Sequence, residues 1–277
     1  MALAWVASVA ASSPLEEGAS YLLSRQQADG GFAERGRSST PGLTAWVILG
    51  LSASMSGPTT QEAAELAAGD YLASVEPSRA TDLELRLLAL AALGQDVSEL
   101  ADQIEDLRQS SGRIGPQINS TIWGVIALAQ ADRKPDRRSV YFLLRQQRES
   151  GGWSWSARAA PDCGDTAAAV QALRAASVSK HSKALVRAVL YLKGCQNKDG
   201  GFGTSPEADS DAQSTAWAIQ GLLAAGVEPS AAAFRYLARL RQPDGSYSYS
   251  ARYQATPVWV TAQVLCALAR KPFPLSP

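Results

Sequence analysis

The sequence predicts an all-α protein, an α6/α6 double ring in which six inner helices stand inside six outer ones. Two repeated features predict this fold. The first is a turn after a Leu-rich run: glutamine, three residues, glycine, one residue and an aromatic. The second is a threonine near the start of an apolar segment, with a leucine seven residues later on the same helical face. The repeat period of about 38 to 49 residues leaves room for two helices and two turns.

Three copies of the turn keep the full pattern. They are Gln26–Gly30–Phe32, Gln147–Gly151–Trp153 and Gln196–Gly200–Phe202. A fourth copy, Arg241–Gly245–Tyr247, keeps the spacing with its glutamine one place late, at Gln242. In the first three copies a second glycine follows the first, and glycine ends helices because it tolerates positive φ. Each copy therefore marks the end of one helix and the start of a turn.

The helices between these turns fall into two sets. Outer helices are predicted where charged and amide side chains lie on one face, at residues 15–27, 61–75, 98–109, 136–148, 182–195 and 230–241. Inner helices are predicted where the segment is almost uniformly apolar, at residues 42–55, 82–93, 119–131, 165–176, 213–225 and 257–269. The repeated threonines are Thr44, Thr121, Thr166, Thr215 and Thr261, and Leu83 takes that place in a degenerate copy. No segment alternates with period two, so strands are not expected, and six pairs favour a closed ring over an open solenoid.

Length and charge limit the possible functions. A chain of 277 residues with 46% hydrophobic content can build one domain of six helix pairs, predicted at residues 15–277. Twenty-six basic and twenty-six acidic residues give a formal net charge of zero, which provides no basic field for nucleic acid. No run of eighteen apolar residues occurs, so no transmembrane segment is expected. Oligomeric state is not predicted.

Residues 1–14 precede the repeats and read MALAWVASVAASSP. An apolar body rich in small residues is typical of the end of an export signal, although a positive n-region is missing. Two interpretations stay open: a remnant of an export signal, which predicts an extracytoplasmic or secreted protein, or an N-terminal helix of a cytoplasmic one. The three cysteines, Cys163, Cys195 and Cys266, show no metal spacing and the single histidine falls in a polar loop, so no metal or cofactor is expected.

Tryptophans recur at matching places in the inner helices. Trp46, Trp123 and Trp217 each stand two residues after the repeated threonine, and Trp259 stands two residues before Thr261. Such rings could bind a ligand and hold a carbocation by cation–π attraction. The alternative is packing between layers of the ring, which is the commoner use of aromatic side chains at repeated positions.

Acidic residues gather at the starts of two consecutive inner helices. Asp162 and Asp165 lie in PDCGDTA beside Thr166, and Asp209 and Asp211 precede the next inner helix. We expect the four carboxylates at one acidic rim, where repulsion raises the pKa of an acid and prepares it for protonation chemistry. The alternative for Asp165 is a helix N-cap, which stabilises the ionised carboxylate instead.

These repeats resemble the α/α-toroid shared by squalene and oxidosqualene cyclases, protein prenyltransferase β subunits and the cobalamin-binding domains of the transcobalamin group. The resemblance implies that functional residues ring the cavity mouth, at the N-terminal ends of the inner helices. PDCGDTA is similar to the Asp-x-Asp-Asp-Thr-Ala motif of squalene-hopene cyclases, whose middle aspartate protonates an alkene. Asp162 and Asp165 match the outer carboxylates of that motif, and Gly164 stands in place of the acid.

Two hypotheses of function follow from the resemblance. The first is a cofactor-free, terpene cyclase-like enzyme in which Asp162 or Asp165 protonates an isoprenoid among the tryptophans and Thr166. The second is a non-catalytic, extracytoplasmic binding ring for a hydrophobic or cobalamin-like ligand or a protein partner. A prenyltransferase β subunit is disfavoured, because its zinc site needs a histidine that only His181 could supply. Gly164 leaves both hypotheses open, since it removes the expected general acid.

Overall fold

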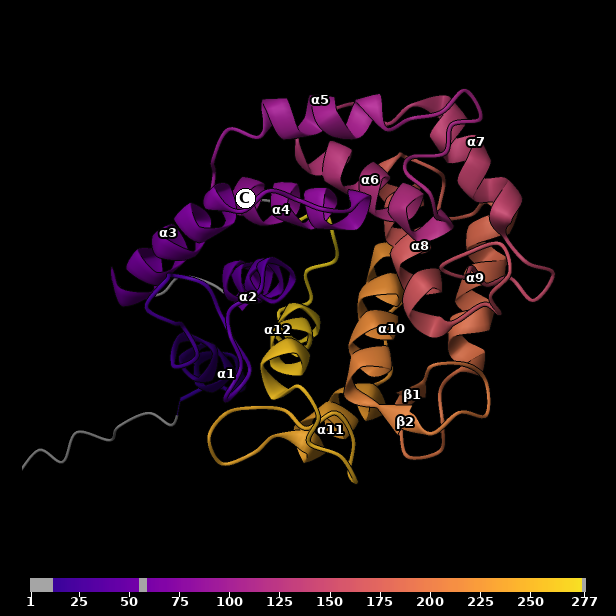
Figure 1. The fold of residues 1–277 in the computed structure, drawn as a ribbon. Coiled ribbons are helices and arrows are strands. Elements are labelled where there is room, and N and C mark those ends of the chain that lie inside the picture. The colour runs from indigo at the N-terminus through magenta and orange to yellow at the C-terminus, as the bar shows by residue number, and fades with distance from the viewer. Residues whose placement is uncertain (1–11, 55–58, 276–277) are drawn as a thin grey trace, which may run out of the picture.

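The computed structural model describes residues 12–54 and 59–275, and these form a closed double ring of helices (Figure 1). The outer helices are α1 (Pro14–Leu23), α3 (Thr59–Ser74), α5 (Ser98–Asp106), α7 (Arg137–Gln146), α9 (Lys183–Gly194) and α11 (Ala231–Leu240). The inner helices are α2 (Pro41–Ser54), α4 (Ala80–Ala92), α6 (Ile118–Gln130), α8 (Cys163–Ala175), α10 (Ala212–Ala224) and α12 (Pro257–Leu268). Each inner helix packs on the next, and α12 packs on α2 to close the ring. The predicted fold class is confirmed.

One detail differs from the expectation, and one prediction is not tested. Among the described residues the only strands are β1 (Phe202–Gly203) and β2 (Ser210–Asp211), an antiparallel pair formed where the long connection after α9 folds back on itself. The predicted export-signal remnant or N-terminal helix falls mostly on residues 1–11, which lie outside the described residues. The first helix begins at Pro14, where the Ser13 hydroxyl accepts a hydrogen bond from the Glu16 N–H at 3.2 Å.

The glutamine of each turn joins two neighbouring units of the ring. Gln147 donates from Nε2 to the carbonyl of Gly151 in its own turn and to the carbonyl of Ala184 in α9, both at 2.8 Å. Gln26 bonds in the same way to its own turn and to a carbonyl of α3. Gln196 bonds its own turn and the hydroxyl of Ser230, the N-cap of α11. The amide therefore closes the turn and ties it to the following pair of helices.

Arginine replaces glutamine in two copies of the turn, and one of these copies is not apparent in the sequence. Arg241 pairs with Glu17 of α1 at 3.0 Å, which joins the last unit to the first. Arg108 begins the unrecognised copy, in which the residue pairing across the turn is Ile114 instead of an aromatic. Arg108 approaches Asp136, the N-cap of α7, at 3.6 Å. An arginine turn thus bonds a carboxylate where a glutamine turn bonds a neutral acceptor of the next unit.

The repeated threonine links each turn to its inner helix. Its hydroxyl accepts the backbone N–H of the residue that ends the turn. The donors are Phe32, Ile114, Trp153, Phe202 and Tyr247, at 2.8–3.1 Å. All five threonines are fully buried. A hydroxyl is needed at this position because the turn would otherwise leave a buried N–H without a partner.

Each long connection also covers the start of the preceding inner helix. In three units, a carbonyl oxygen of the connection accepts a backbone N–H at the start of that helix. The Trp155 carbonyl accepts the Asn119 N–H of α6, the Thr204 carbonyl accepts the Cys163 N–H of α8, and the Tyr249 carbonyl accepts the Ala212 N–H of α10. At the point where the ring closes, the Glu34 carboxylate accepts from the N–H groups of Val258 and Trp259 in α12. The connections therefore form a collar around the N-terminal ends of the inner helices, where polar side chains gather.

Candidate functional site

A cavity of about 410 Å³ lies at the N-terminal ends of the inner helices, inside this collar. Its lining follows the repeat in two layers. The upper layer is formed by the residues that come two positions before the repeated threonine position in the sequence: Thr81, Asn119, Gly164, Gln213 and Trp259. The lower layer stands two residues after it and contains Trp46, Leu85, Trp123, Ala168, Trp217 and Gln263. The cavity is therefore polar near the collar and mainly apolar deeper in the ring.

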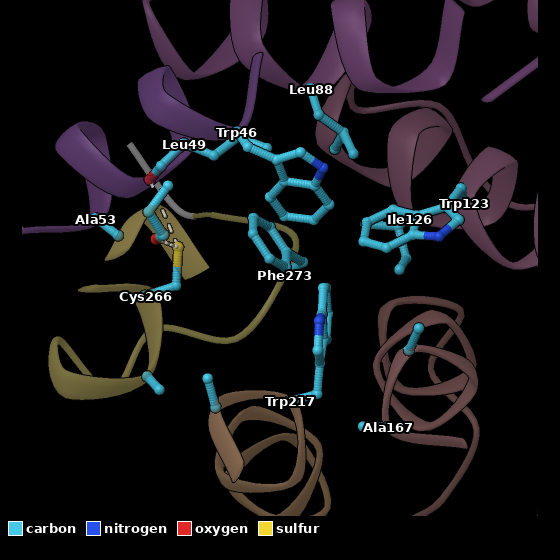
Figure 2. Close-up of a cluster of buried hydrophobic side chains, with 14 of the residues drawn as sticks. Trp46, Leu49, Ala53, Leu88, Trp123, Ile126, Ala167, Trp217, Cys266 and Phe273 are labelled. Atoms are coloured by element: carbon cyan, nitrogen blue, oxygen red, sulfur yellow. Dashed lines mark hydrogen bonds between the residues drawn. The ribbon is translucent and has the colours of Figure 1, made fainter. Parts of the chain in front are cut away.

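Three tryptophans of the lower layer form the floor of the cavity. Trp46, Trp123 and Trp217 meet edge to face, with ring centroids 5.5–5.6 Å apart. Phe273 packs against all three tryptophans, and its ring centroid lies 6.1 Å from the centroid of each (Figure 2). The tryptophans thus pack on one another and also present surface to the cavity, so the two roles considered for them occur together.

The chain after α12 closes the opposite end of the ring. The Phe273 N–H donates to Oε1 of Gln171 at 2.6 Å, and Nε2 of Gln130 donates to the Leu275 carbonyl at 2.7 Å. These two glutamines lie in α8 and α6, so the inner helices themselves hold the tail. The centre of the ring below the tryptophans is therefore filled by side chains, and the cavity is restricted to the N-terminal end.

Asp165 lines the cavity and is 9% exposed. Nδ2 of Asn119 in α6 donates to its Oδ1 at 2.6 Å, which orients the carboxyl group. Burial is the largest cause that raises its pKa, followed by the negative charge of Asp162, while the Asn119 hydrogen bond lowers it. The pKa of Asp165 reaches about 8. The carboxyl group therefore keeps its proton at neutral pH, which is a requirement for a general acid.

Asp162, and not Asp165, is the N-cap of α8. Its Oδ1 accepts the N–H of Asp165 at 2.8 Å, and its backbone is extended with φ −132°. The alternative that Asp165 caps the helix is wrong, because Asp165 is already inside the first turn of a helix that begins at Cys163. Because Asp162 satisfies the free N–H, the Asp165 carboxyl group is available to the cavity.

The predicted acidic rim is only partly present. Asp211 is buried as the N-cap of α10, where it accepts from the N–H and the hydroxyl of Ser214, both at 2.7 Å. Asp209 is exposed on the connection before it. Neither side chain lines the cavity, and Thr166 is also outside the lining because its hydroxyl bonds the Trp153 N–H. The cavity brings together Trp46, Trp123, Asp162, Asp165, Trp217 and Trp259.

Several polar residues of the lining were not predicted from the sequence. Asn119 and Gln213 occupy the same upper-layer position as Trp259, so the repeat register could have identified them. Gly164 occupies this position too, and a Cβ added there would lie 3.5 Å from Oδ1 of Asp162, an ordinary van der Waals contact. The position that carries the acid in the resembling motif therefore faces the cavity and has room for a side chain.

In the part of the chain that the structure describes, no group of three or more His, Cys, Asp or Glu side chains is arranged to hold a metal ion. All three cysteines are buried free thiols. No described helix is both long enough and apolar enough to cross a membrane.

Solved structures of low sequence identity share this fold. A protein from Actinoplanes aligns with a TM-score of 0.71 at 20% identity, covering 93% of this chain and 98% of the other. The type II terpene cyclase MstE from Scytonema, in a complex with geranylgeranyl dihydroxybenzoate, aligns with a TM-score of 0.72 at 16% identity, covering 93% and 96%. Protein geranylgeranyltransferase-I from Candida albicans, complexed with GGPP, aligns with a TM-score of 0.67 at 12% identity, covering 92% and 90%.

At these identities, the three structures establish the fold alone. No curated protein matches the sequence. A family model does match: the squalene-hopene cyclase C-terminal domain, over residues 124–276. This match spans more than half of the chain and includes the α8 segment with Asp162 and Asp165. The chain therefore belongs to the squalene-hopene cyclase C-terminal domain family.

Proposed function

We propose that this protein is a terpene cyclase-like enzyme that binds an acyclic isoprenoid in the cavity and protonates it from Asp165. One observation carries the proposal: a buried carboxyl group, whose surroundings raise its pKa, faces a cavity with a tryptophan floor. The cavity of about 410 Å³ lies within the roughly 300–1,000 Å³ of small-molecule sites. The family match supports the proposal, as do the geranylgeranyl ligands of the two enzymes of similar fold.

The chemistry is an isomerisation that needs no cofactor. The Asp165 proton forms a C–H bond with one carbon of an alkene, and the other carbon becomes a cation. An internal alkene attacks that cation to form a C–C bond and a ring, and the final cation loses a proton, which restores the neutral acid. The rings of Trp46, Trp123 and Trp217 face the cation and stabilise it by cation–π attraction. The Asn119 amide stabilises the Asp165 carboxylate left by the first step.

The test is product formation from linear isoprenoids. Purified protein is incubated with squalene, geranylgeraniol or geranylgeranyl diphosphate, and cyclic isomers are detected by gas chromatography with mass spectrometry, after dephosphorylation for the diphosphate. We expect Asp165→Asn to abolish the product while quenching of tryptophan fluorescence still reports binding. The matched control is Asp209→Asn, which removes an exposed carboxylate outside the cavity and should leave the product unchanged. A cyclic product that survives Asp165→Asn would exclude Asp165 as the acid.

The second candidate is a non-catalytic binding ring, and Gly164 favours it. In the resembling motif the acid stands at this cavity-facing position, which here has no side chain. A binding ring would hold a hydrophobic or cobalamin-like ligand, or a protein partner, outside the cytoplasm. Isoprenoid binding by the wild-type protein without any cyclic product, together with recovery of the protein from the extracytoplasmic fraction of its host, would favour this candidate over the enzyme.

A further inference from the structure

A side groove of about 570 Å³ adjoins the cavity. Thr81, Leu85 and Trp259 line both spaces. The other apolar residues of the groove come from the start of α2, the end of α3 and the connection that follows it. They are Pro41, Leu43, Leu72, Val75 and Pro77. Because the same three side chains face both spaces, the groove and the cavity are neighbours. Charged side chains also line the groove, and two of them, Arg79 and Asp82, pair with each other at 3.0 Å.

The groove exists because one connection of the ring is short. Residues 75–79 alone join α3 to α4, whereas residues 24–40, 147–162, 195–211 and 241–256 join other outer helices to their inner partners. Those long connections each cover the start of the preceding inner helix. By the same pattern residues 75–79 would cover the start of α2, but they are too few to form the turn. The start of α2 therefore borders open space.

The start of α2 is adapted to the missing cover. Pro41, its first residue, has no N–H, and the Thr40 hydroxyl accepts the N–H of Leu43 at 3.3 Å. Gly42 stands two residues before Thr44, at the upper-layer position where Trp259 carries a large side chain. A Cβ added to Gly42 would meet no atom within 4 Å. The absence of a side chain at Gly42 therefore widens the groove beside Trp259.

We propose that this groove is the second part of the substrate site and holds the hydrocarbon chain that trails behind the end protonated at Asp165. This inference rests on the proposed function and adds to it a subsite, built by this chain's own short connection, for the trailing part of the substrate. The helices α2 and α8 lie on opposite sides of the inner ring (Figure 1). A chain that extends from Asp165 to Gly42 would cross the tryptophan floor and pass Trp259 and Leu85, which line both spaces.

The experiment fills the groove and measures how affinity depends on chain length. Gly42→Phe places a ring in the groove, and tryptophan fluorescence follows the binding of farnesol and of squalene, which is twice as long. We expect Gly42→Phe to raise the Kd for squalene by about tenfold or more and the Kd for farnesol by less than about twofold. The matched control is Gly194→Phe at the end of α9, where a Cβ also meets no atom within 4 Å. It should change neither Kd.

Val75→Phe fills the groove from the opposite wall and replaces Gly42→Phe if that variant does not fold, as judged by circular dichroism. If filling the groove raises the Kd for farnesol and for squalene equally, or raises neither, the groove is not part of the substrate site. The protein would still bind isoprenoids in the cavity. If the wild-type protein binds neither ligand, the proposed function fails, and the groove inference fails with it. If Asp165→Asn leaves activity intact while groove filling still selects against squalene, only the identity of the acid is wrong.

Discussion

The two ends of the ring are built from the same helix pairs but are closed in different ways. At the C-terminal end of the inner helices, Phe273 packs under three tryptophans and two glutamines hold the tail. At the N-terminal end, the connections form a collar around a cavity that contains Asp165. Apolar packing at one end therefore supplies stability, so that the other end can keep a buried acid and an open cavity.

The largest effect is expected at the closed end. Phe273→Ala removes a ring that is 2% exposed and contacts the three tryptophans. We expect the free energy of unfolding to fall by about 3–5 kcal/mol, measured by urea denaturation. Phe234→Ala, at a half-buried position in α11, is the control and should cost less. Equal costs for the two variants would mean that the tail contributes no more than an ordinary outer helix.

The open end should lose stability as the pH rises. Folding raises the pKa of Asp165 from its usual value of 3.8 to about 8, so its protonated form is favoured in the folded state. Its contribution to stability is complete below about pH 4, is lost between about pH 4 and 8, and changes no further above that range. We expect the difference in the free energy of unfolding between the wild-type protein and Asp165→Asn to change by a few kcal/mol over pH 5 to 8, since each pKa unit corresponds to about 1.4 kcal/mol.

The measurement is denaturation of both proteins from pH 5 to 8. Glu84 and Asp211 are also buried carboxyl groups with raised pKa values, but both are present in the variant, so the difference isolates Asp165. Parallel curves for the two proteins would show that Asp165 is ionised at neutral pH and would remove the acid from the proposed mechanism. Cyclic product, where formed, should also decrease as the pH rises through about 8.

The collar should be less sensitive than either end. Gln147→Ala removes two hydrogen bonds from Nε2, one within its turn and one to α9. We expect the free energy of unfolding to fall by about 1–3 kcal/mol, because two carbonyl oxygens lose a partly buried donor. Gln242→Ala is the control: this glutamine bonds only the nearby Leu240 carbonyl, at 3.0 Å. If Gln147→Ala lowers the melting temperature no more than the control does, the turn does not link neighbouring units.

The features that repeat around the ring could be predicted from the sequence, and the features that depart from the repeat could not. The threonine register predicted the inner helices, because one hydroxyl repeats one hydrogen bond in five of the six units. The turn at Arg108 escaped detection because it has neither the glutamine nor the aromatic residue of the pattern: Arg108 and Ile114 stand at those places. The sequence left two roles open for Asp165, helix cap and cavity acid, because the cap Asp162 and the cavity residue Asp165 are less than one helical turn apart.

The tail and the Asn119 contact were not predictable for a different reason. Phe273 follows the last repeat, and no local pattern indicates that residues after α12 turn back into the ring. Asn119 and Asp165 lie on neighbouring inner helices, and their 2.6 Å contact depends on the relative height of those helices in the closed ring. Periodicity identifies the face of a helix that points inward, but it does not give the pairs of side chains that meet there.

The smallest effect is expected at the seam where the last unit meets the first. Arg241 and Glu17 are each about one-third exposed, at 37% and 33% of their side chains, so water screens their pair. Arg241→Ala should lower the free energy of unfolding by no more than about 1 kcal/mol, and salt should reduce the difference from the wild-type protein. Arg241→Gln tests the equivalence of the two kinds of turn, since three other copies use glutamine at this place. If Arg241→Gln is as stable as the wild-type protein and insensitive to salt, the seam is held like the rest of the collar. A loss above about 2 kcal/mol in either variant would instead make the seam a principal support of the open end.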